Sequence, residues 1–195
     1  TENRNFHFQN IKKISDINFF EGYWQSSKYF EKNKKKIFDS FNFRRLNDKK
    51  FLSVYRKIRK SPNPVLVGIR LYEETKNPNY YSLTSKIKKP ENINKIITKI
   101  NKKYKNCDFF IFSSKNNKFI KTLNFPVGKA NFIFEEDGFT DSVKNLYLMK
   151  SCKHFIFMNS TYYWWAAWLS DNEKKFKNRK IFADKNFKNP HALCD

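Results

Sequence analysis

Several features that would mark a secreted, membrane-spanning or zinc-binding protein are missing from the sequence. No apolar run is long enough to cross a bilayer, and the N-terminus does not have the pattern of a signal peptide. The three cysteines, Cys107, Cys152 and Cys194, are far apart and form no CxxC pair, so neither a disulfide framework nor a zinc motif is indicated. The three histidines are too scattered to suggest a metal site. We therefore expect a soluble protein of a reducing compartment, without a metal.

Acidic residues are also scarce. The chain has 18 Asp and Glu against 40 Lys and Arg, which gives a formal net charge of +22. Such a field attracts phosphates on nucleic acid, anionic lipid or nucleotides. The lysines are spread along the chain, and Asn, Ile and Phe are abundant with them, as AT-rich coding produces. We interpret most of them as solvated helix faces, with attraction to phosphate or membrane as a by-product.

Aromatic residues, in contrast, are plentiful. The 195 residues include 22 Phe, 10 Tyr and 4 Trp, with only 4 Gly and 6 Pro. This apolar area is enough to offset the entropy of ordering one sizeable domain. The composition therefore predicts a folded chain over most of its length.

From residue 63 onward, apolar runs alternate with segments of helical periodicity. The runs predict buried strands over 64–70, 107–114, 129–137, 154–160 and 179–184. Helices are predicted over 91–104, 140–153 and 162–170, with a short one near 116–125. This alternation is typical of an α/β fold with a doubly wound, Rossmann-like parallel sheet that is covered on both faces.

The residues before this alternation have a different character. An aromatic cluster near residues 19–30 is followed by an amphipathic helix that ends near Phe41. We interpret residues 1–62 as the end of a preceding region that packs against an α/β domain formed by residues 63–195.

Polar residues end several of the predicted strands. They are Arg70, Ser113-Ser114, Glu135-Glu136 and Asn159-Ser160-Thr161. In parallel sheets, ligands bind at the carboxyl ends of the strands, where helix N-termini collect and favour anions. Ser160 and Thr161 therefore suggest an anion site, although a simple helix N-cap would use the same residues.

Arg70 directly follows a buried strand, and phosphate is the anion that its guanidinium fork matches best. Glu73 and Glu74 lie just beyond it. They are either salt-bridge partners of nearby cations or the source of a general base.

The helix predicted over 162–170 carries Trp164, Trp165 and Trp168. Trp164 and Trp168 share a face, which favours packing in the core over stacking on a base or sugar. Aromatic residues elsewhere lie within apolar runs, and no RRM, KH or helix-turn-helix motif is visible, so nucleic acid is not the expected partner.

Two segments resemble a known family. The stretch "NLYLMKSCKHFIFMNSTYYWWAAWLS", from Asn145 to Ser170, is similar to the Asp-x-x-Leu-Met, Cys-Lys-His and Asn-Ser-Thr-x-x-Trp-Trp-x-Ala-Trp-Leu pattern of the bacterial α-1,2-fucosyltransferases of glycosyltransferase family 11. The stretch "FFEGYWQSSKYF" resembles the family's Gly-Tyr-x-Gln-Ser-x-Lys-Tyr-Phe segment, and "VLVGIRLYEE" occupies the place of its His-x-Arg-Arg-Gly-Asp motif.

The resemblance implies a GT-B-like architecture and a metal-independent, inverting transfer of fucose from GDP-fucose, with no other cofactor. In that scheme Arg70 neutralises charge on the β-phosphate, and Asn159, Ser160 and Thr161 hold the pyrophosphate. The resemblance further implies that Asp141 or Asn145 lies near the guanine, that Trp164 borders the donor, and that Glu73 is the base.

The sequence also departs from the family. Gly68 replaces the motif's His, Leu71 its second Arg, and Asn145 the Asp that precedes Leu-Met. The family's N-terminal Gly-Gly-Leu-Gly-Asn-Gln segment is absent, and the chain begins at Thr1 rather than Met, which is typical of a fragment, a processed chain or a trimmed one.

We therefore expect a fucosyltransferase, or its donor-binding portion, that builds a surface polysaccharide such as O-antigen in the bacterial cytoplasm. A lipid-linked oligosaccharide acceptor and contact with the surface of the inner membrane would suit its basic charge. The alternatives are a transferase that uses another nucleotide sugar, and a basic nucleic-acid-binding or scaffold protein without this chemistry.

Overall fold

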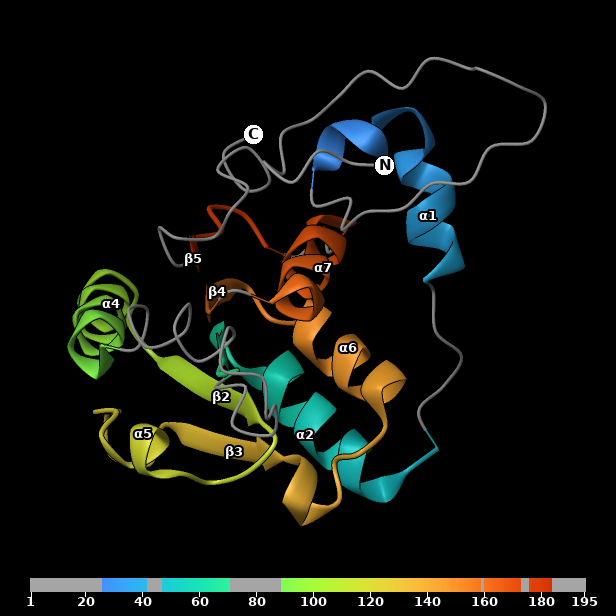
Figure 1. Ribbon diagram of the computed structural model, residues 1–195. Helices are drawn as coiled ribbons and strands as arrows, with labels where there is room; N and C mark the ends of the chain where they lie inside the picture. Colours follow the sequence, from blue (N-terminus) through green and yellow to red (C-terminus); the bar gives the residue numbers. More distant parts are fainter. Residues whose placement is uncertain (1–25, 42–46, 71–88, 159, 173–175, 184–195) are drawn as a thin grey trace, which may run out of the picture.

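A computed structural model describes residues 26–41, 47–70, 89–158, 160–172 and 176–183 (Figure 1). Its helices are α1 (Lys34–Ser40), α2 (Lys49–Lys60), α4 (Pro90–Lys103), α5 (Lys118–Lys121), α6 (Ser142–Lys150) and α7 (Thr161–Leu169). Short 3-10 helices are η1 (Ser27–Tyr29), η2 (Glu31–Asn33), η3 (Glu135–Asp137) and η4 (Ser170–Asn172). The strands are β1 (Asn63–Gly68), β2 (Cys107–Ser113), β3 (Ala130–Phe134), β4 (His154–Phe157) and β5 (Ile181–Ala183). No helix among these residues is both long and apolar enough to cross a membrane.

The five strands form one parallel sheet in the order β3-β2-β1-β4-β5. The first strand, β1, is therefore the central one. Strands β2 and β3 lie on one side of it, and β4 and β5 lie on the other. This confirms the predicted α/β class and the Rossmann-like parallel sheet. The GT-B-like pairing with a second domain stays a prediction.

Helices pack on both faces of the sheet, because β1, β2 and β4 direct buried apolar side chains alternately to the two sides. Leu66, Phe110 and Phe155 face a core cluster that α2, α6 and α7 complete. Val67 and Ile111 face a second cluster under α4 and α5. In Figure 1 the two groups of helices lie on opposite sides of the sheet.

Side chains fix where several helices begin. The carboxylate of Asp48 accepts the backbone N–H of Lys50 at 2.9 Å and starts α2, and that of Asp141 accepts the N–H of Lys144 at 3.0 Å and starts α6. Helix α2 was not predicted, because lysines and arginines surround its few apolar residues and make the helical periodicity difficult to recognise. The usable signal was Asp48 as N-cap followed by Phe51 and Ile58, which share a buried face.

The residues before β1 pack on the α/β core. The ring of Phe30 lies 5.1 Å from that of Trp165, and the ring of Phe38 lies 4.8 Å from that of Trp168. Helix α2 packs on α6. These contacts account for Phe30 and Phe38, whereas residues 19–25 of the aromatic cluster lie outside the described residues. The division into regions 1–62 and 63–195 stays a prediction.

Candidate functional site

A cavity of about 420 Å³ opens at the carboxyl edge of the sheet. Its described lining comes from the ends of β1, β2 and β3 and from the starts of α6 and α7. The lining residues are Ile69, Arg70, Phe112, Ser113, Ser114, Ile133, Glu135, Ser142, Asn145, Ser160, Thr161, Tyr162 and Tyr163. The cavity lies beside the reversal of strand order at β1 and β4, where open α/β sheets bind ligands.

The structure brings together most of the polar residues that were predicted at strand ends. Arg70, Ser113-Ser114, Glu135 and Ser160-Thr161 all line this cavity. Glu136 turns away and accepts the backbone N–H of Asn116 at 2.6 Å. Glu73 and Asn159 lie outside the described residues.

The start of α7 presents a polar end to the cavity. Ser160 is the N-cap residue in extended conformation, and its side chain makes no capping hydrogen bond. The N-cap interpretation therefore accounts for the position of Ser160 but not for its hydroxyl. The first backbone N–H groups of α7 and the positive end of its dipole favour an anion here. Arg70, half-buried, contributes a guanidinium to the same cavity.

Asn145 presents a buried acceptor at the cavity. Its side chain is 7% exposed, and its Nδ2 donates to the carbonyl of Phe139 at 2.7 Å. Its Oδ1 has no hydrogen-bond partner among the described residues. A buried acceptor without a partner is costly, and a ligand N–H in the cavity would satisfy it. An Asp at this position would place a carboxylate oxygen next to the Phe139 carbonyl oxygen, and the two would repel each other. The amide N–H of Asn145 instead donates to that carbonyl.

Two tyrosines of α7 build the floor and one wall. The Tyr163 hydroxyl lies 3.3 Å from the carbonyl of Ile69 and 3.1 Å from that of Phe112, so it can donate to either at the ends of β1 and β2. The Tyr162 hydroxyl donates to the carbonyl of Ser142 at the start of α6. Burial, and then the charges of Glu135 and Asp141, raise the pKa of Tyr162, so this phenol stays protonated.

The remaining predicted site residues lie outside the lining. Asp141 caps α6 and pairs with Lys144, 3.4 Å between the carboxylate and the ammonium. Trp164 is fully buried and stacks on Trp168 with ring centroids 6.3 Å apart. The structure thus places Trp164 in the core behind the cavity, where the packing interpretation had put it.

Other lining residues were not predicted. Tyr163, Ser142 and the apolar Ile69, Phe112 and Ile133 stand at the last positions of strands or the first positions of helices. The sequence could have indicated them only by their positions at the ends of predicted strands and the starts of predicted helices, and not by their residue types. Within the described residues, no group of His, Cys, Asp and Glu gathers in a way that could hold a metal ion.

Comparisons with known proteins agree with this architecture. The model of the family described as "Glycosyl transferase family 11" matches residues 4–192. An "Alpha-1,2-colitosyltransferase" of Escherichia coli is 28% identical over 153 residues, which cover 78% of this chain and 51% of the relative. An "O-antigen biosynthesis glycosyltransferase WbnK" of Escherichia coli is 47% identical over 47 residues, which cover 23% of this chain and 16% of that protein. The aligned part thus spans about half the length of the first relative and less of the second. No solved structure matches the chain.

Proposed function

This chain belongs to glycosyltransferase family 11, and we propose that its cavity binds the nucleotide part of a GDP-sugar donor. The observation that carries the proposal is one cavity lined by two unlike sets of polar groups, which we assign to the two ends of the nucleotide. The first end is Arg70 with the start of α7, and the second is Asn145, whose buried Oδ1 has no hydrogen-bond partner among the described residues.

The first end suits a pyrophosphate. Arg70 offers a planar, charged donor, Ser160 and Thr161 offer hydroxyls, and the N-terminus of α7 offers backbone N–H groups. Arg70 would neutralise the charge that builds on the β-phosphate as the sugar departs. Asn159, next to Ser160 in sequence, is proposed to complete this end.

The second end suits a base edge with N–H donors. Guanine presents such donors, and Asn145 Oδ1 can accept one of them. Glu135, an exposed carboxylate of the lining, can accept hydrogen bonds from ribose or sugar hydroxyls. We propose that Asp141 does not contact the base itself. It caps the start of α6 and so supports the position of Asn145.

We propose the reaction that the family resemblance implies. An acceptor hydroxyl oxygen attacks the anomeric carbon, the bond from that carbon to the β-phosphate oxygen breaks, and GDP leaves with the electron pair. The hydroxyl proton passes to a base, for which Glu73 stays the prediction. The product would be an α-1,2-linked fucose on a surface polysaccharide such as O-antigen, formed without a metal.

A second donor is favoured by a specific observation. One relative is named as a colitosyltransferase, and the cavity wall includes the apolar Ile69, Phe112 and Ile133. An apolar wall tolerates sugars that lack hydroxyls. A GDP-linked deoxysugar other than fucose is therefore the alternative donor.

Thermal unfolding with ligands tests the proposal. We expect GDP and GDP-fucose, at about 100 times their Kd, to raise the Tm by about 5 °C or more, because a ligand that binds only the folded state stabilises it. UDP-sugars and a DNA oligonucleotide should have smaller effects. No response to any GDP species, together with salt-sensitive binding of the oligonucleotide, would contradict the proposal.

Substitution of the two ends locates the nucleotide. Arg70→Ala should weaken GDP binding by about tenfold or more through loss of a charged hydrogen bond. Asn145→Leu should weaken GDP binding by about tenfold while it leaves inorganic pyrophosphate binding unchanged. The control is Asn131→Leu, since Asn131 also donates to a backbone carbonyl, that of Phe109, but does not line the cavity. Equal effects of the two Asn substitutions would remove Asn145 from the site.

A further inference from the structure

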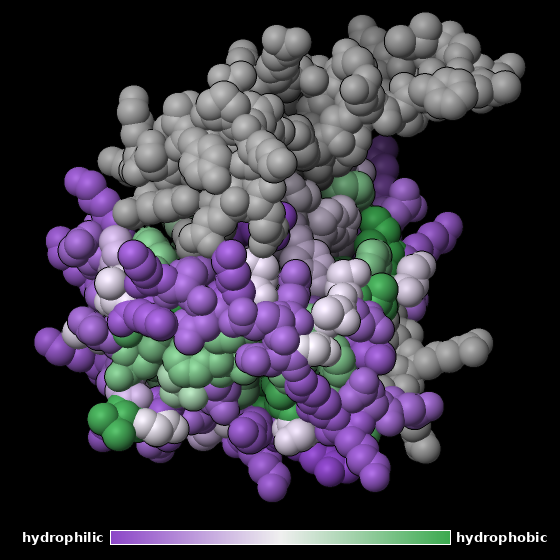
Figure 2. All heavy atoms as spheres, turned by 60° about the horizontal axis from the view of Figure 1, so that its bottom comes forward, coloured by the Kyte–Doolittle hydropathy of each residue, from purple (hydrophilic) through white to green (hydrophobic). Residues whose placement is uncertain are grey.

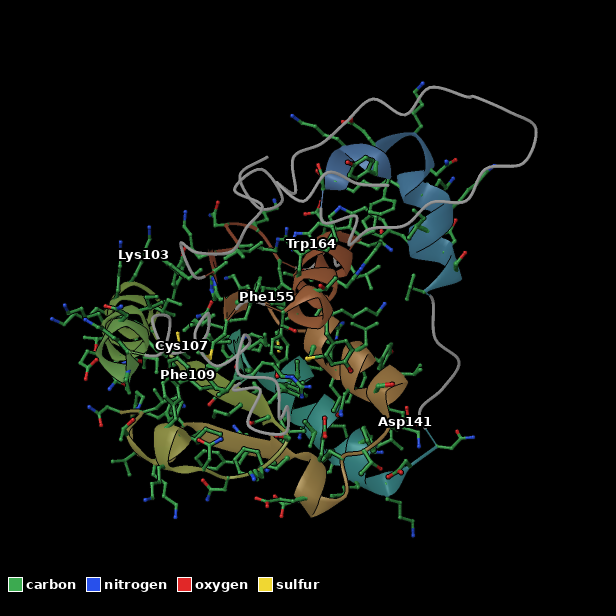
Figure 3. The ribbon with its side chains drawn as sticks, in the orientation of Figure 1. Lys103, Cys107, Phe109, Asp141, Phe155 and Trp164 are labelled. Carbon is green, nitrogen blue, oxygen red and sulfur yellow. The ribbon has the colours of Figure 1, made fainter. Side chains whose placement is uncertain are left out.

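The amino ends of the five strands, which lie opposite the cavity, are preceded by strongly basic segments. The segments that lead into the five strands, 59–62, 102–106, 126–129, 150–153 and 177–180, read RKSP, KKYKN, PVGK, KSCK and KNRK. None of them contains a carboxylate. Because all five strands are parallel, these segments lie along one edge of the sheet, which we call the amino rim. Figure 3 labels Lys103 on this side of the molecule and Asp141 on the opposite side.

Carboxylates gather at the other edge instead. Residues 135–137 and Asp141 follow β3, and Asp48 and Glu91 stand at the starts of α2 and α4. Cations are also present there, so the two signs nearly balance around the cavity. The five rim segments, in contrast, hold 11 lysines and arginines and no carboxylate, so a large part of the excess positive charge of the described residues lies at the amino rim.

Two described carboxylates, Asp108 and Asp171, pair with residues of the rim. Asp108 accepts the hydroxyl of Ser61 at 2.6 Å and the ammonium of Lys129 at 3.3 Å. Asp171 pairs with Lys34 at 2.6 Å and with Arg179 at 2.7 Å. Each of them thus neutralises one cation of the rim, Lys129 or Arg179, and neither is paired with Lys60, Lys105 or Lys180 among the described residues.

Helix ends account for only part of this charge. Cations in the last turns of α2 and α4 stabilise the negative ends of those helix dipoles. Lys105, Lys177 and Lys180 are exposed and lie in loops outside any helix. They serve no helix end, so the rim carries more cations than its helices require.

An apolar side chain projects from this basic surface. Val127 is fully exposed, at 100%, in a turn closed by the N–H of Lys129, which donates to the carbonyl of Pro126 at 3.1 Å. Gly128 follows with φ of 70°, and a Cβ added there would meet no atom of the described residues within 4 Å. Figure 2, which brings α5 and β3 forward, shows apolar surface set among hydrophilic side chains on this part of the molecule. Basic residues around an exposed apolar side chain are typical of surfaces that bind anionic bilayers.

The aromatic residue of the rim does not favour nucleic acid. The ring of Tyr104 lies against that of His154, with centroids 4.3 Å apart, and the ammoniums of Lys103 and Lys153 lie 5.7 and 5.4 Å from its centroid. Its faces are therefore occupied, whereas single-stranded nucleic acid needs open aromatic faces for stacking.

We propose that the amino rim binds an anionic lipid bilayer, with Val127 inserted at the level of the headgroups. The length of β1 and β2, roughly 20 Å at about 3.3 Å per residue, then separates the bilayer from the cavity. The cavity faces the aqueous phase, where a nucleotide arrives. If the proposed function holds, this distance also favours acceptors whose growing end extends away from their lipid anchor.

Sedimentation of the full chain with vesicles tests the proposal. The chain should bind vesicles that contain phosphatidylglycerol, should not bind phosphatidylcholine vesicles, and should be released at about 0.5 M NaCl. The variant Lys60→Glu, Lys105→Glu, Lys180→Glu should lose vesicle binding by about tenfold or more. The matched control, Lys49→Glu, Lys89→Glu, Lys118→Glu, makes the same change of charge at the cavity edge and should lose less than about threefold.

A second pair of variants tests the apolar contact. Val127→Asp should weaken vesicle binding several-fold, whereas Val143→Asp, at an exposed valine of the cavity edge, should not. Equal losses in the two lysine variants would show that net charge alone drives binding and would overturn the proposal. So would an absence of vesicle binding with rim-dependent binding of a DNA oligonucleotide. Thermal unfolding and GDP binding of the rim variant should be nearly unchanged, which separates this proposal from that for the cavity.

Discussion

At the end of β1, the ring of Tyr163 takes the space that a side chain on residue 68 would need. A Cβ added to Gly68 would lie 2.7 Å from carbons of that ring. The same tyrosine reaches the carbonyls of Ile69 and Phe112, so it joins α7 to two strands below the cavity. The absence of a side chain on Gly68 is what admits the tyrosine.

Gly68→Ala should therefore lower the free energy of unfolding by about 1–3 kcal/mol, because the Tyr163 ring must shift in a packed interior. It should also weaken GDP binding, since the floor of the cavity moves. Chemical denaturation and nucleotide titration measure the two effects.

The matched experiment adds Tyr163→Ser to Gly68→Ala. The cost of the alanine should largely disappear in this background, because the ring that it meets is gone. Additive losses of stability would show that the contact does not limit residue 68.

For single residues, the sequence predicted the edge of the sheet on which a side chain lies better than it predicted which residues that side chain contacts. The placement of Arg70, Ser160 and Thr161 followed from their positions at strand ends, where chain direction fixes the edge on which they lie. The contact of Gly68 with Tyr163 could not be predicted, since it joins residues far apart in the sequence. The environment of Asn145 could not be predicted for the same reason. Its Nδ2 donates to the carbonyl of Phe139, and this orientation leaves its Oδ1 without a partner among the described residues.

Among the helices, α6 links the cavity to the rest of the fold. Its start carries Ser142 and Asn145, and Asp141 caps it. The ammonium of Lys144 lies 3.4 Å from Asp141 and 3.5 Å from Asp48, the cap of α2. The starts of two helices are thus joined through one lysine.

Asp141→Ala should lower the free energy of unfolding by about 1 kcal/mol through loss of the cap. GDP binding should weaken modestly, because the start of α6 frays around Asn145. Thermal unfolding and nucleotide titration provide the two measurements.

Asp141→Asn is the informative control. An amide oxygen still caps the helix, so both stability and GDP binding should stay near those of the parent chain. A large loss of GDP binding with stability retained would instead show direct contact of this carboxylate with the base.

The type and order of the elements after residue 63 were predictable, because apolar runs and helical periodicity alternate clearly there. Their bounds were less so: the helix predicted over 140–153 spans Ser142–Lys150, and the strand predicted over 179–184 spans Ile181–Ala183. Helix α2 was missed because its buried Phe51 and Ile58 stand among lysines and arginines.

For the molecule as a whole, acid should destabilise the fold beginning near neutral pH. His154 is fully buried at the start of β4, and its Nδ1 accepts the backbone N–H of Lys180 at 3.1 Å. Burial, with the positive charges of Lys153 and Lys180, lowers the pKa of His154 to about 4. The unfolded chain therefore binds this proton first.

The free energy of unfolding should consequently be highest above about pH 6.5 and fall by up to about 3 kcal/mol as the pH drops toward 4. His154→Phe should remove most of this slope, whatever its effect on stability at pH 7. Denaturant titrations at several pH values measure it, and an unchanged slope in the variant would assign the effect to other groups. Asp48 and Asp141 have a lowered pKa and add a further loss at lower pH, as their capping carboxylates become protonated.

The central position of β1 has a consequence for synthesis on the ribosome. Val65 pairs with Phe109 on one side and with His154 on the other. The first of these partners emerges early, whereas the second emerges only after α6 has been made. During that interval an apolar strand exposes one open edge, which is the kind of surface that chaperones cover and that aggregation uses. The middle strand of the finished sheet is thus the vulnerable edge of the nascent chain.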